Sequence, residues 1–274
     1  TIWDQGGHRW EAAPWLPGTA DYEVDPRPER LRAAMRALAE FHVIAAKCEP
    51  TDESQPSPGV QQRHSQLRTW LGGRLDSLVP HVAFPDSTGN SAPPSKGAPL
   101  ASEDELPAVA RQILACVPAV AQNILASLTS SLTIRVPLQP CLRDVWHDHV
   151  LFQGDSVTGL IDYGAMRRET VAADIARLLG SFVGDDAQGW QIGLDEYHSV
   201  RPLSPAERSL VATFDLSSVV LAPLNWLQWL YLDGRVFEDR AALLKRLRGW
   251  AGRLRRLTER MERQFHIPSG RISP

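Results

Sequence analysis

The sequence predicts an α+β protein that is mostly helical, and three observations support this prediction. Apolar residues recur at helical spacing over seven segments, whereas strand-like runs are few and short. The strand-like runs come in neighbouring pairs joined by glycine-containing turns, a pattern typical of β-hairpins. The chain has 274 residues, of which 43% are hydrophobic. That is enough for one large domain or two small domains with a full core.

The residue types between the seven segments indicate where each predicted helix begins and ends. The predicted helices span residues 28–48, 61–79, 103–128, 170–182, 190–198, 205–232 and 238–265. Pro28 suits the first turn of its helix, and Thr170 can cap another. Gly72 and Gly73 weaken the second helix by roughly 1 kcal/mol each. Short strands are expected at residues 1–3, 8–12 and 133–138.

Composition limits the cell compartment and the partners that we expect. The net charge of −3 gives no global basic field for nucleic acid. Cys48, Cys116 and Cys141 lie far apart without metal-ligand spacing, which fits a reducing cytosol. No signal peptide opens the chain, and no apolar run approaches the roughly 18 residues of a membrane span. We therefore expect a cytoplasmic protein that binds neither nucleic acid nor membrane.

The densest set of ionisable side chains lies in the loop at residues 143–149, Arg-Asp-Val-Trp-His-Asp-His. An apolar strand at 150–152, a tight turn and a second apolar strand at 157–161 follow, and Asp162 ends the second strand. Because a hairpin folds back on itself, Asp144 and Asp162 should approach each other. Two converging carboxylates suit a divalent cation and a proton acceptor.

This pattern resembles the catalytic hairpin of kinase-like phosphotransferases, and more narrowly that of the aminoglycoside phosphotransferase family. That family includes small-molecule kinases related to choline and homoserine kinases. The shared pattern is an Asp, four residues, a metal-capable side chain, an apolar hairpin and then Asp-aromatic-Gly, here Asp162-Tyr163-Gly164. The resemblance implies a protein-kinase-like C-terminal lobe with a small catalytic β-hairpin. It also implies ATP or GTP as phosphoryl donor, with Mg²⁺.

The resemblance assigns a role to each matching residue of the hairpin. Asp144 stands at the catalytic aspartate, which orients the acceptor hydroxyl and accepts its proton. Asp162 matches the metal aspartate, and His149 stands where the family has a metal-binding asparagine. Asp174 resembles the later structural aspartate, which holds the catalytic loop by hydrogen bonds.

The beginning of the chain also fits. Residues 9–18 resemble the strand and hinge that join the two kinase lobes, where the backbone near Glu11 and Ala13 would meet adenine. Residues 37–42 resemble the first helix after the hinge. We therefore expect the last strands of the small lobe and the hinge at 1–18, and the large lobe at 19–274. Residues 80–102, rich in Pro, Ser and Gly, are expected to be a flexible insertion.

Several positions depart from the family pattern. Leu142-Arg143 replaces His-Gly, and Trp146 replaces a second histidine. His149 replaces asparagine, and an imidazole suits Mn²⁺ or Zn²⁺ better than Mg²⁺, so Mn²⁺ is an alternative metal.

The small lobe of such enzymes supplies a strand lysine for the nucleotide phosphates, and no lysine of this chain follows a strand before the hinge. The three lysines are Lys47, Lys96 and Lys245. The interpretation is a small-molecule kinase that transfers the γ-phosphate of a nucleotide to a hydroxyl and is truncated here.

Two alternatives remain open. One is a catalytically impaired pseudokinase or binding module. The other is a metal-dependent hydrolase, since His147 and His149 lie two residues apart near Asp144. Trp226 and Trp229 are candidates for the acceptor pocket, and the acceptor itself is not identified by the sequence.

Overall fold

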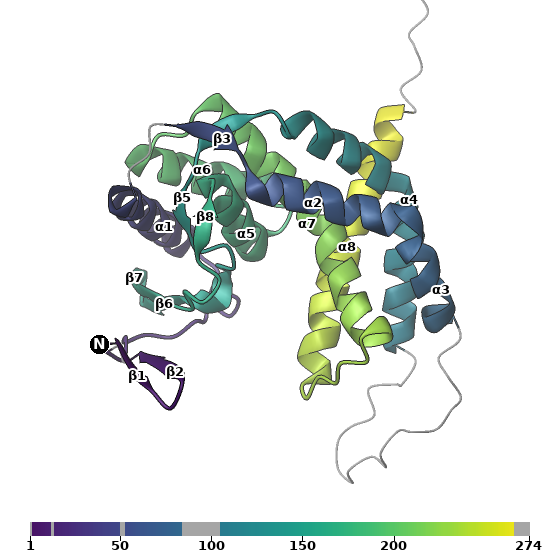
Figure 1. The fold of residues 1–274 in the computed structure, drawn as a ribbon, viewed down its shortest axis with the longest axis horizontal. Helices are drawn as coiled ribbons and strands as arrows, with labels where there is room; N and C mark the ends of the chain where they lie inside the picture. The colour runs from purple at the N-terminus through teal and green to yellow at the C-terminus, as the bar shows by residue number, and fades with distance from the viewer. Residues whose placement is uncertain (1, 12–13, 50–52, 84–104, 266–274) are drawn as a thin grey trace, which may run out of the picture. The chain divides into compact units, whose positions relative to one another are not determined.

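The structure is a computed structural model that describes residues 2–11, 14–49, 53–83 and 105–265 (Figure 1). The chain divides into two compact units. One comprises Thr1–Glu53 and Pro137–Glu207, and the other comprises Ser54–Val136 and Arg208–Pro274. Long helices and short two-stranded ribbons make up both units, which confirms the mostly helical α+β prediction.

The first unit contains the hairpin that carries the predicted site. Its elements are β1 (Ile2–Gln5), β2 (His8–Glu11), α1 (Pro28–Cys48), β5 (Gln139–Cys141), the 3₁₀ turn η2 (His147–His149), β6 (Val150–Gln153), β7 (Ser156–Leu160), β8 (Arg167–Glu169), α5 (Val171–Val183) and α6 (Ala187–Val200). Helix α1 packs along α6, and α5 contacts both of them (Figure 1). The face of α1 that makes these contacts is apolar, with Leu31, Met35 and Leu38 fully buried.

Both hairpins turn at glycine-containing segments. β1 and β2 pair so that Gln5 lies opposite His8. Gly6 and Gly7 form the two-residue turn between them, with φ values of 61° and 76°. In the second hairpin, β6 and β7 pair from Val150–Leu160 to Gln153–Ser156, with a bulge at Leu151/Phe152. Both hairpins were predicted from the sequence.

The third ribbon of this unit was not predicted. Strand β8 pairs antiparallel with β5, so that Cys141 lies opposite Arg167. The strand expected at residues 133–138 corresponds to β4 (Arg135–Pro137), and β5 is a separate strand that follows it. Strand β5 ends at Cys141, so its pairing with β8 fixes the start of the loop that carries Asp144.

The second unit is built from helices. Its elements are β3 (Ser54–Pro56), α2 (Pro58–Thr69), the π-helical turn η1 (Trp70–Arg74), α3 (Leu75–Ala83), α4 (Glu105–Ser131), β4, α7 (Pro205–Leu227), the π-helical turn η3 (Gln228–Leu232) and α8 (Arg240–Phe265). Helix α4 runs beside α8 and contacts α2 (Figure 1). In the η3 region, the rings of Trp226 and Trp229 meet edge to face, with centroids 5.0 Å apart.

The helix expected at residues 61–79 is wrong in its bounds and its continuity. It begins at Pro58, where the Ser57 hydroxyl accepts a bond from the Val60 N–H at 3.1 Å. It is interrupted at η1, where Gly73 has a φ of 120°, which L-residues rarely adopt. Its last part, α3, continues through Pro80 to Ala83. The remainder of the predicted insertion, residues 84–102, lies outside the described residues.

Two described helices are long and apolar enough, by length and composition, to cross a membrane: Glu105–Ser131 and Pro205–Leu232. The prediction that no apolar segment approaches the length of a membrane span is therefore wrong. Both helices contain polar residues, but few of these are charged, so the mean hydropathy stays high. Within the structure, 33% and 61% of their most apolar windows are buried. Core helices of folded proteins meet the same criterion, so these two helices assign no membrane location.

Candidate active site

The loop after β5 is held by one buried carboxylate. Asp174 is completely buried. Its two oxygens accept the backbone N–H groups of Leu142 and Arg143, both at 2.6 Å. To present its N–H in this way, Arg143 adopts a left-handed backbone with φ 67°. This is the geometry expected for a structural aspartate, and it explains why a glycine suits the position of Arg143.

Helix α5 holds the loop at two further points. Asp174, Arg177 and Ser181 are spaced three and four residues apart, so they share one face of the helix. An Arg177 guanidinium N–H donates to Asp144 Oδ1 at 2.8 Å. The Ser181 hydroxyl accepts the His147 backbone N–H at 3.1 Å. Sequence reasoning found Asp174 but missed Arg177 and Ser181. Their spacing from Asp174 is the signal that could have found them.

A buried network supports Asp174 from behind. His42 of α1 lies 3.1 Å from Asp174 through Nε2 and 2.7 Å from the Tyr197 hydroxyl through Nδ1. Burial raises the pKa of Tyr197, so its hydroxyl keeps its proton. The His42 ring therefore links the Tyr197 hydroxyl at Nδ1 to the Asp174 carboxylate at Nε2. The network thereby connects α1 and α6 to the loop.

Asp144, the predicted base, is accessible. Its side chain is 54% exposed, and Arg177 holds one of its oxygens. The other oxygen, Oδ2, has no partner among the described residues. Asp144 therefore pairs with α5, and the expected close approach to Asp162 is not seen as a direct interaction in the described part of the chain.

Asp162 ends the hairpin with a left-handed backbone, φ 64°, which aspartate tolerates better than most residues. Its side chain is 60% exposed, and its Oδ2 lies 3.6 Å from His149 Nε2. The next residue, Tyr163, donates its hydroxyl to the Leu160 carbonyl at 2.8 Å. The structure thus brings together the two residues predicted to bind metal.

The two metal candidates differ in what they can offer a cation. Asp162 presents a solvent-facing carboxylate, the ligand type that Mg²⁺ and Mn²⁺ prefer, and its Oδ1 accepts the Gly164 N–H at 3.4 Å. His149 Nε2 accepts the indole N–H of Trp146 at 2.8 Å, and its Nδ1 is buried without a partner in the described structure. Nε2 can bind a cation only if the bond from Trp146 breaks, so Asp162 fits a metal and His149 in this orientation does not.

Both ring nitrogens of His147 contact carboxylates. Its ring nitrogens lie 3.2 Å from Glu23 and 2.8 Å from Asp148. The two histidines therefore do not direct free nitrogens at one cation, as a metal-dependent hydrolase of the kind considered from the sequence would require.

A different group, deep in the first unit, has metal-like spacing. His42, Cys141 and Asp174 bring their ligand atoms within 4.8 Å of one another. Burial raises the pKa of the Cys141 thiol well above its ordinary value, and this thiol donates to the Glu169 carbonyl at 3.2 Å. A protonated thiol is a poor ligand, and the other two groups bind each other. The group is a hydrogen-bonded core.

The segment predicted as the hinge lies against the hairpin. The Thr19 N–H and carbonyl exchange hydrogen bonds with Phe152 at 3.0 and 2.9 Å. Gly18 has a φ of 108°, and a Cβ there would lie 2.5 Å from Thr158 Oγ1. Of the two predicted adenine-binding positions, Glu11 is the last residue of β2, and Ala13 lies outside the described residues.

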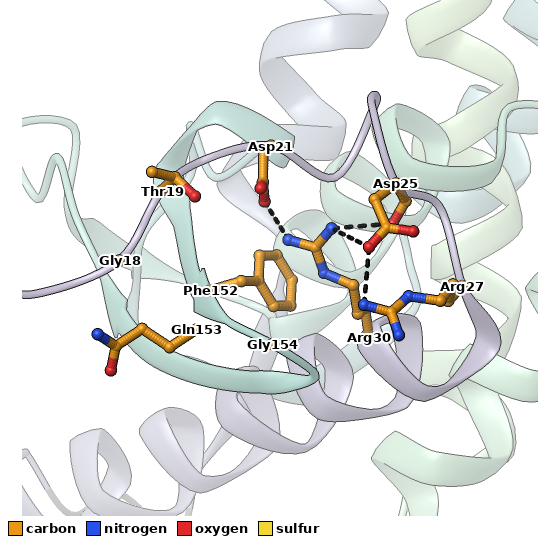
Figure 2. Close-up of a pocket in the computed structure, with 9 residues that line it drawn as sticks. All are labelled: Gly18, Thr19, Asp21, Asp25, Arg27, Arg30, Phe152, Gln153 and Gly154. Atoms are coloured by element: carbon orange, nitrogen blue, oxygen red, sulfur yellow. Dashed lines mark hydrogen bonds and ion pairs between the residues drawn. The ribbon is translucent and has the colours of Figure 1, made fainter.

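A shallow cavity of about 590 Å³ opens between this segment, α1 and the hairpin turn. Its lining residues are Gly18, Thr19, Asp21, Asp25, Arg27, Arg30, Phe152, Gln153 and Gly154 (Figure 2). The Arg30 guanidinium is buried, pairs with Asp21 and Asp25, and lies 4.2 Å from the Phe152 ring centre. Asp144, His149 and Asp162 do not line this cavity, so it is separate from the predicted chemistry.

The sequence matches a family model described as the phosphotransferase enzyme family, over residues 2–203. The chain belongs to this family. The chain is 27% identical over 261 residues to a homoserine kinase of Gluconobacter oxydans (strain 621H). The match covers 86% of this chain and 78% of that enzyme.

Solved structures share the fold. An aminoglycoside phosphotransferase of Alicyclobacillus acidocaldarius subsp. acidocaldarius DSM 446 matches with a TM-score of 0.53 and 19% identity, covering 96% of this chain and 74% of that one. A glucosamine kinase matches with a TM-score of 0.50 and 14% identity, covering 91% and 62%. The chain therefore has the protein-kinase-like fold that the hairpin resemblance implied.

Proposed function

We propose that this phosphotransferase moves the γ-phosphoryl group of ATP, or alternatively GTP, to a hydroxyl of a small molecule. The observation that carries the proposal is the position of Asp144. It lies on a loop fixed by Asp174, with one oxygen held by Arg177 and the other free. A carboxylate held in this way can orient a hydroxyl and receive its proton.

The reaction that we propose exchanges one phosphorus–oxygen bond for another. The acceptor oxygen bonds to the γ-phosphorus while the bond from that phosphorus to the bridging oxygen of the nucleotide breaks. The hydroxyl proton passes to Asp144, and the nucleoside diphosphate leaves. In this step, Arg177 and Asp174 hold the base in place.

Asp162 is the proposed metal ligand, supported by its exposed carboxylate at the end of β7. A bound Mg²⁺, or Mn²⁺, would neutralise charge on the transferred phosphoryl group. His149 as a second ligand stays a prediction, since its Nε2 accepts the Trp146 N–H in this structure.

Other parts of the proposal concern the nucleotide and the cell. The backbone near Glu11 and Ala13 is proposed to meet adenine, supported by the attachment of the following segment to the hairpin at Thr19 and Phe152. Residues 1–18 are proposed to be strands and a hinge of a smaller lobe, which the reading frame upstream of Thr1 would test. A cytoplasmic location, without nucleic-acid or membrane partners, is also a proposal.

The acceptor class is proposed from the relatives. The similar sequences and folds include a homoserine kinase and a glucosamine kinase, both named for hydroxyl-bearing small molecules. A panel of L-homoserine, glucosamine and choline with radiolabelled ATP and Mg²⁺ would test for transfer to an acceptor.

Asp144→Asn is the decisive variant in that assay. We expect it to lower kcat about 10²- to 10⁴-fold, because the amide cannot accept the proton. Asp76→Asn, an exposed aspartate of α3, is the matched control and should keep full activity. The proposal fails if no acceptor is phosphorylated by the unaltered protein, or if Asp144→Asn remains as active as the control.

The Trp146–His149 bond favours a second candidate function. Because it occupies the nitrogen at the family's metal position, the protein could be a binding module without transfer activity. Calorimetry with ATP, with and without Mg²⁺, separates the two candidates. A binding module would bind nucleotide with the same affinity in both conditions, whereas the enzyme should bind it more tightly with Mg²⁺.

A further inference from the structure

We propose that Arg177 is a specificity residue that binds a carboxylate of the acceptor, so that the acceptors are hydroxy acids or hydroxy amino acids. This inference rests on the proposed function, and it adds the chemical class of the acceptor and the residue that recognises it. Neither the family match nor the fold assigns a role to Arg177.

The position of Arg177 is the first part of the argument. It lies one turn after Asp174 on α5, and its guanidinium is 2.8 Å from Asp144 Oδ1. A hydroxyl bound to the free Oδ2 of Asp144 would therefore lie close to this guanidinium. A substituent on the next one or two carbons of the acceptor could reach it.

The unused donors of Arg177 are the second part. A guanidinium has five N–H donors in a planar fork. Asp144 is the one partner that Arg177 has among the described residues, and the Arg177 side chain is 33% exposed. Several N–H groups are therefore open to solvent beside the base. A carboxylate can accept two of them in parallel, whereas an ammonium at that place would be repelled.

A purely structural role is the competing explanation. Arg177 could do no more than hold Asp144, in which case its loss would lower kcat for every acceptor to the same extent. A specificity role predicts a different result: the loss should fall on KM, and only for acceptors that carry a carboxylate. The two explanations therefore separate in kinetics.

The experiment uses three pairs of acceptors whose members differ by one carboxylate. The pairs are L-serine and ethanolamine, L-homoserine and 3-aminopropan-1-ol, and glycerate and ethylene glycol. Binding of each compound is followed by ligand-observed NMR without nucleotide, and phosphoryl transfer is measured with ATP and Mg²⁺. The proteins are the unaltered chain, Arg177→Gln, Arg177→Lys and Arg32→Gln.

For at least one pair, we expect the unaltered protein to prefer the carboxylate-bearing member roughly 10- to 100-fold, the range of a charge-assisted hydrogen bond. Arg177→Gln should abolish this preference, and its KM for the carboxylate-bearing member should rise by about the same factor. Arg177→Lys should restore part of it, since lysine keeps the charge but not the fork. Arg32→Gln replaces an exposed arginine of α1 and should change nothing.

Failure of this inference can be told apart from failure of the proposed function. Selective binding of the carboxylate-bearing members without any transfer would support the Arg177 site and overturn the proposed activity. Transfer without preference, or an equal fall in kcat for both members in Arg177→Gln, would overturn the inference and leave the activity standing. The absence of binding and transfer for every compound would overturn both.

Discussion

Arg143 and Asp162 are the two described non-glycine residues with a positive φ, and both lie at the site. Arg143 shows what this conformation costs. Its φ of 67° costs an L-residue about 1–2 kcal/mol. The loop cannot relax this angle, because the Arg143 N–H donates to Asp174 Oδ1 at 2.6 Å. The bond to Asp174 thus holds Arg143 in a left-handed conformation, in the loop that carries Asp144.

This backbone conformation predicts a difference between two variants that lose the same side chain. Arg143→Gly should be more stable than Arg143→Ala by about 1 kcal/mol, because glycine adopts the left-handed region without a steric penalty. Urea denaturation of both variants measures the difference. If the alanine variant were as stable as the glycine variant, the loop would not require a left-handed residue at this position.

Trp146 and His149 both depart from the family pattern, and in the structure the two side chains are hydrogen-bonded to each other. The sequence presents them as separate replacements of a histidine and an asparagine. The Trp146 indole N–H donates to His149 Nε2 at 2.8 Å, so the residue at one changed position binds the residue at the other. The sequence predicted His149 and Asp162 as metal ligands, and Nε2 of His149 lies 3.6 Å from Oδ2 of Asp162. Sequence reasoning could not foresee that the His149 lone pair would be engaged, since that depends on two side-chain rotamers.

At the scale of elements, α5 organises the site. One face of this helix binds two backbone N–H groups through Asp174, the base through Arg177 and a further N–H through Ser181. These contacts differ in strength, because bonds to a buried carboxylate are worth more than a bond to a hydroxyl.

Asp174→Asn and Ser181→Ala should therefore differ in their effects. We expect the free energy of unfolding to fall by roughly 2–4 kcal/mol in Asp174→Asn, because an amide can accept only on one side and would direct its own N–H groups at a donor. Ser181→Ala should lose about 1 kcal/mol. Urea denaturation measures both values. Equal losses in the two variants would show that α5 does not hold the loop mainly through Asp174.

Elements with a local signal could be predicted, and elements that depend on distant partners could not. The Thr170 cap and the apolar spacing after it predicted α5, and the family resemblance of residues 172–178 indicated the role of Asp174. Strand β8, with the sequence Arg-Arg-Glu, has no apolar alternation and forms through its pairing with β5. Arg177 was missed for a similar reason. A polar residue on an amphipathic helix is usually solvated, and only the folded loop supplies its partner.

At the scale of the molecule, ion pairs join three separate stretches of the first unit. Arg30 of α1 pairs with Asp21 and Asp25, and Arg27 pairs with Asp25 (Figure 2). Arg27 also pairs with Asp155 in the hairpin turn. The segment after β2, the start of α1 and the β6–β7 turn are thereby connected. The sequence showed these acids and arginines only as a charged stretch before a helix, so this connection could not be predicted from it.

The connection makes stability depend on pH in a defined direction. The Arg30 guanidinium beside Asp21 lowers the pKa of that carboxyl from its ordinary value of 3.8. A carboxyl whose pKa is lower in the folded state stabilises the protein above the unfolded-state pKa. That contribution is lost as the pH falls through the folded-state value. Because the Asp21 side chain is half exposed, we expect a contribution of at most about 1 kcal/mol.

Asp21→Asn tests this dependence. At pH 7 and pH 5 the variant should be less stable than the unaltered protein by a constant amount, because Asp21 is ionised at both pH values. Below about pH 4 the difference should shrink, because Asp21 takes up a proton first in the unfolded state and, at lower pH, in the folded state as well. Urea midpoints at pH 7, 5, 4 and 3 measure it, with Asp76→Asn as a control for loss of an exposed aspartate. A difference that stayed constant down to pH 3 would mean that Asp21 supports the fold through its shape and not through its charge.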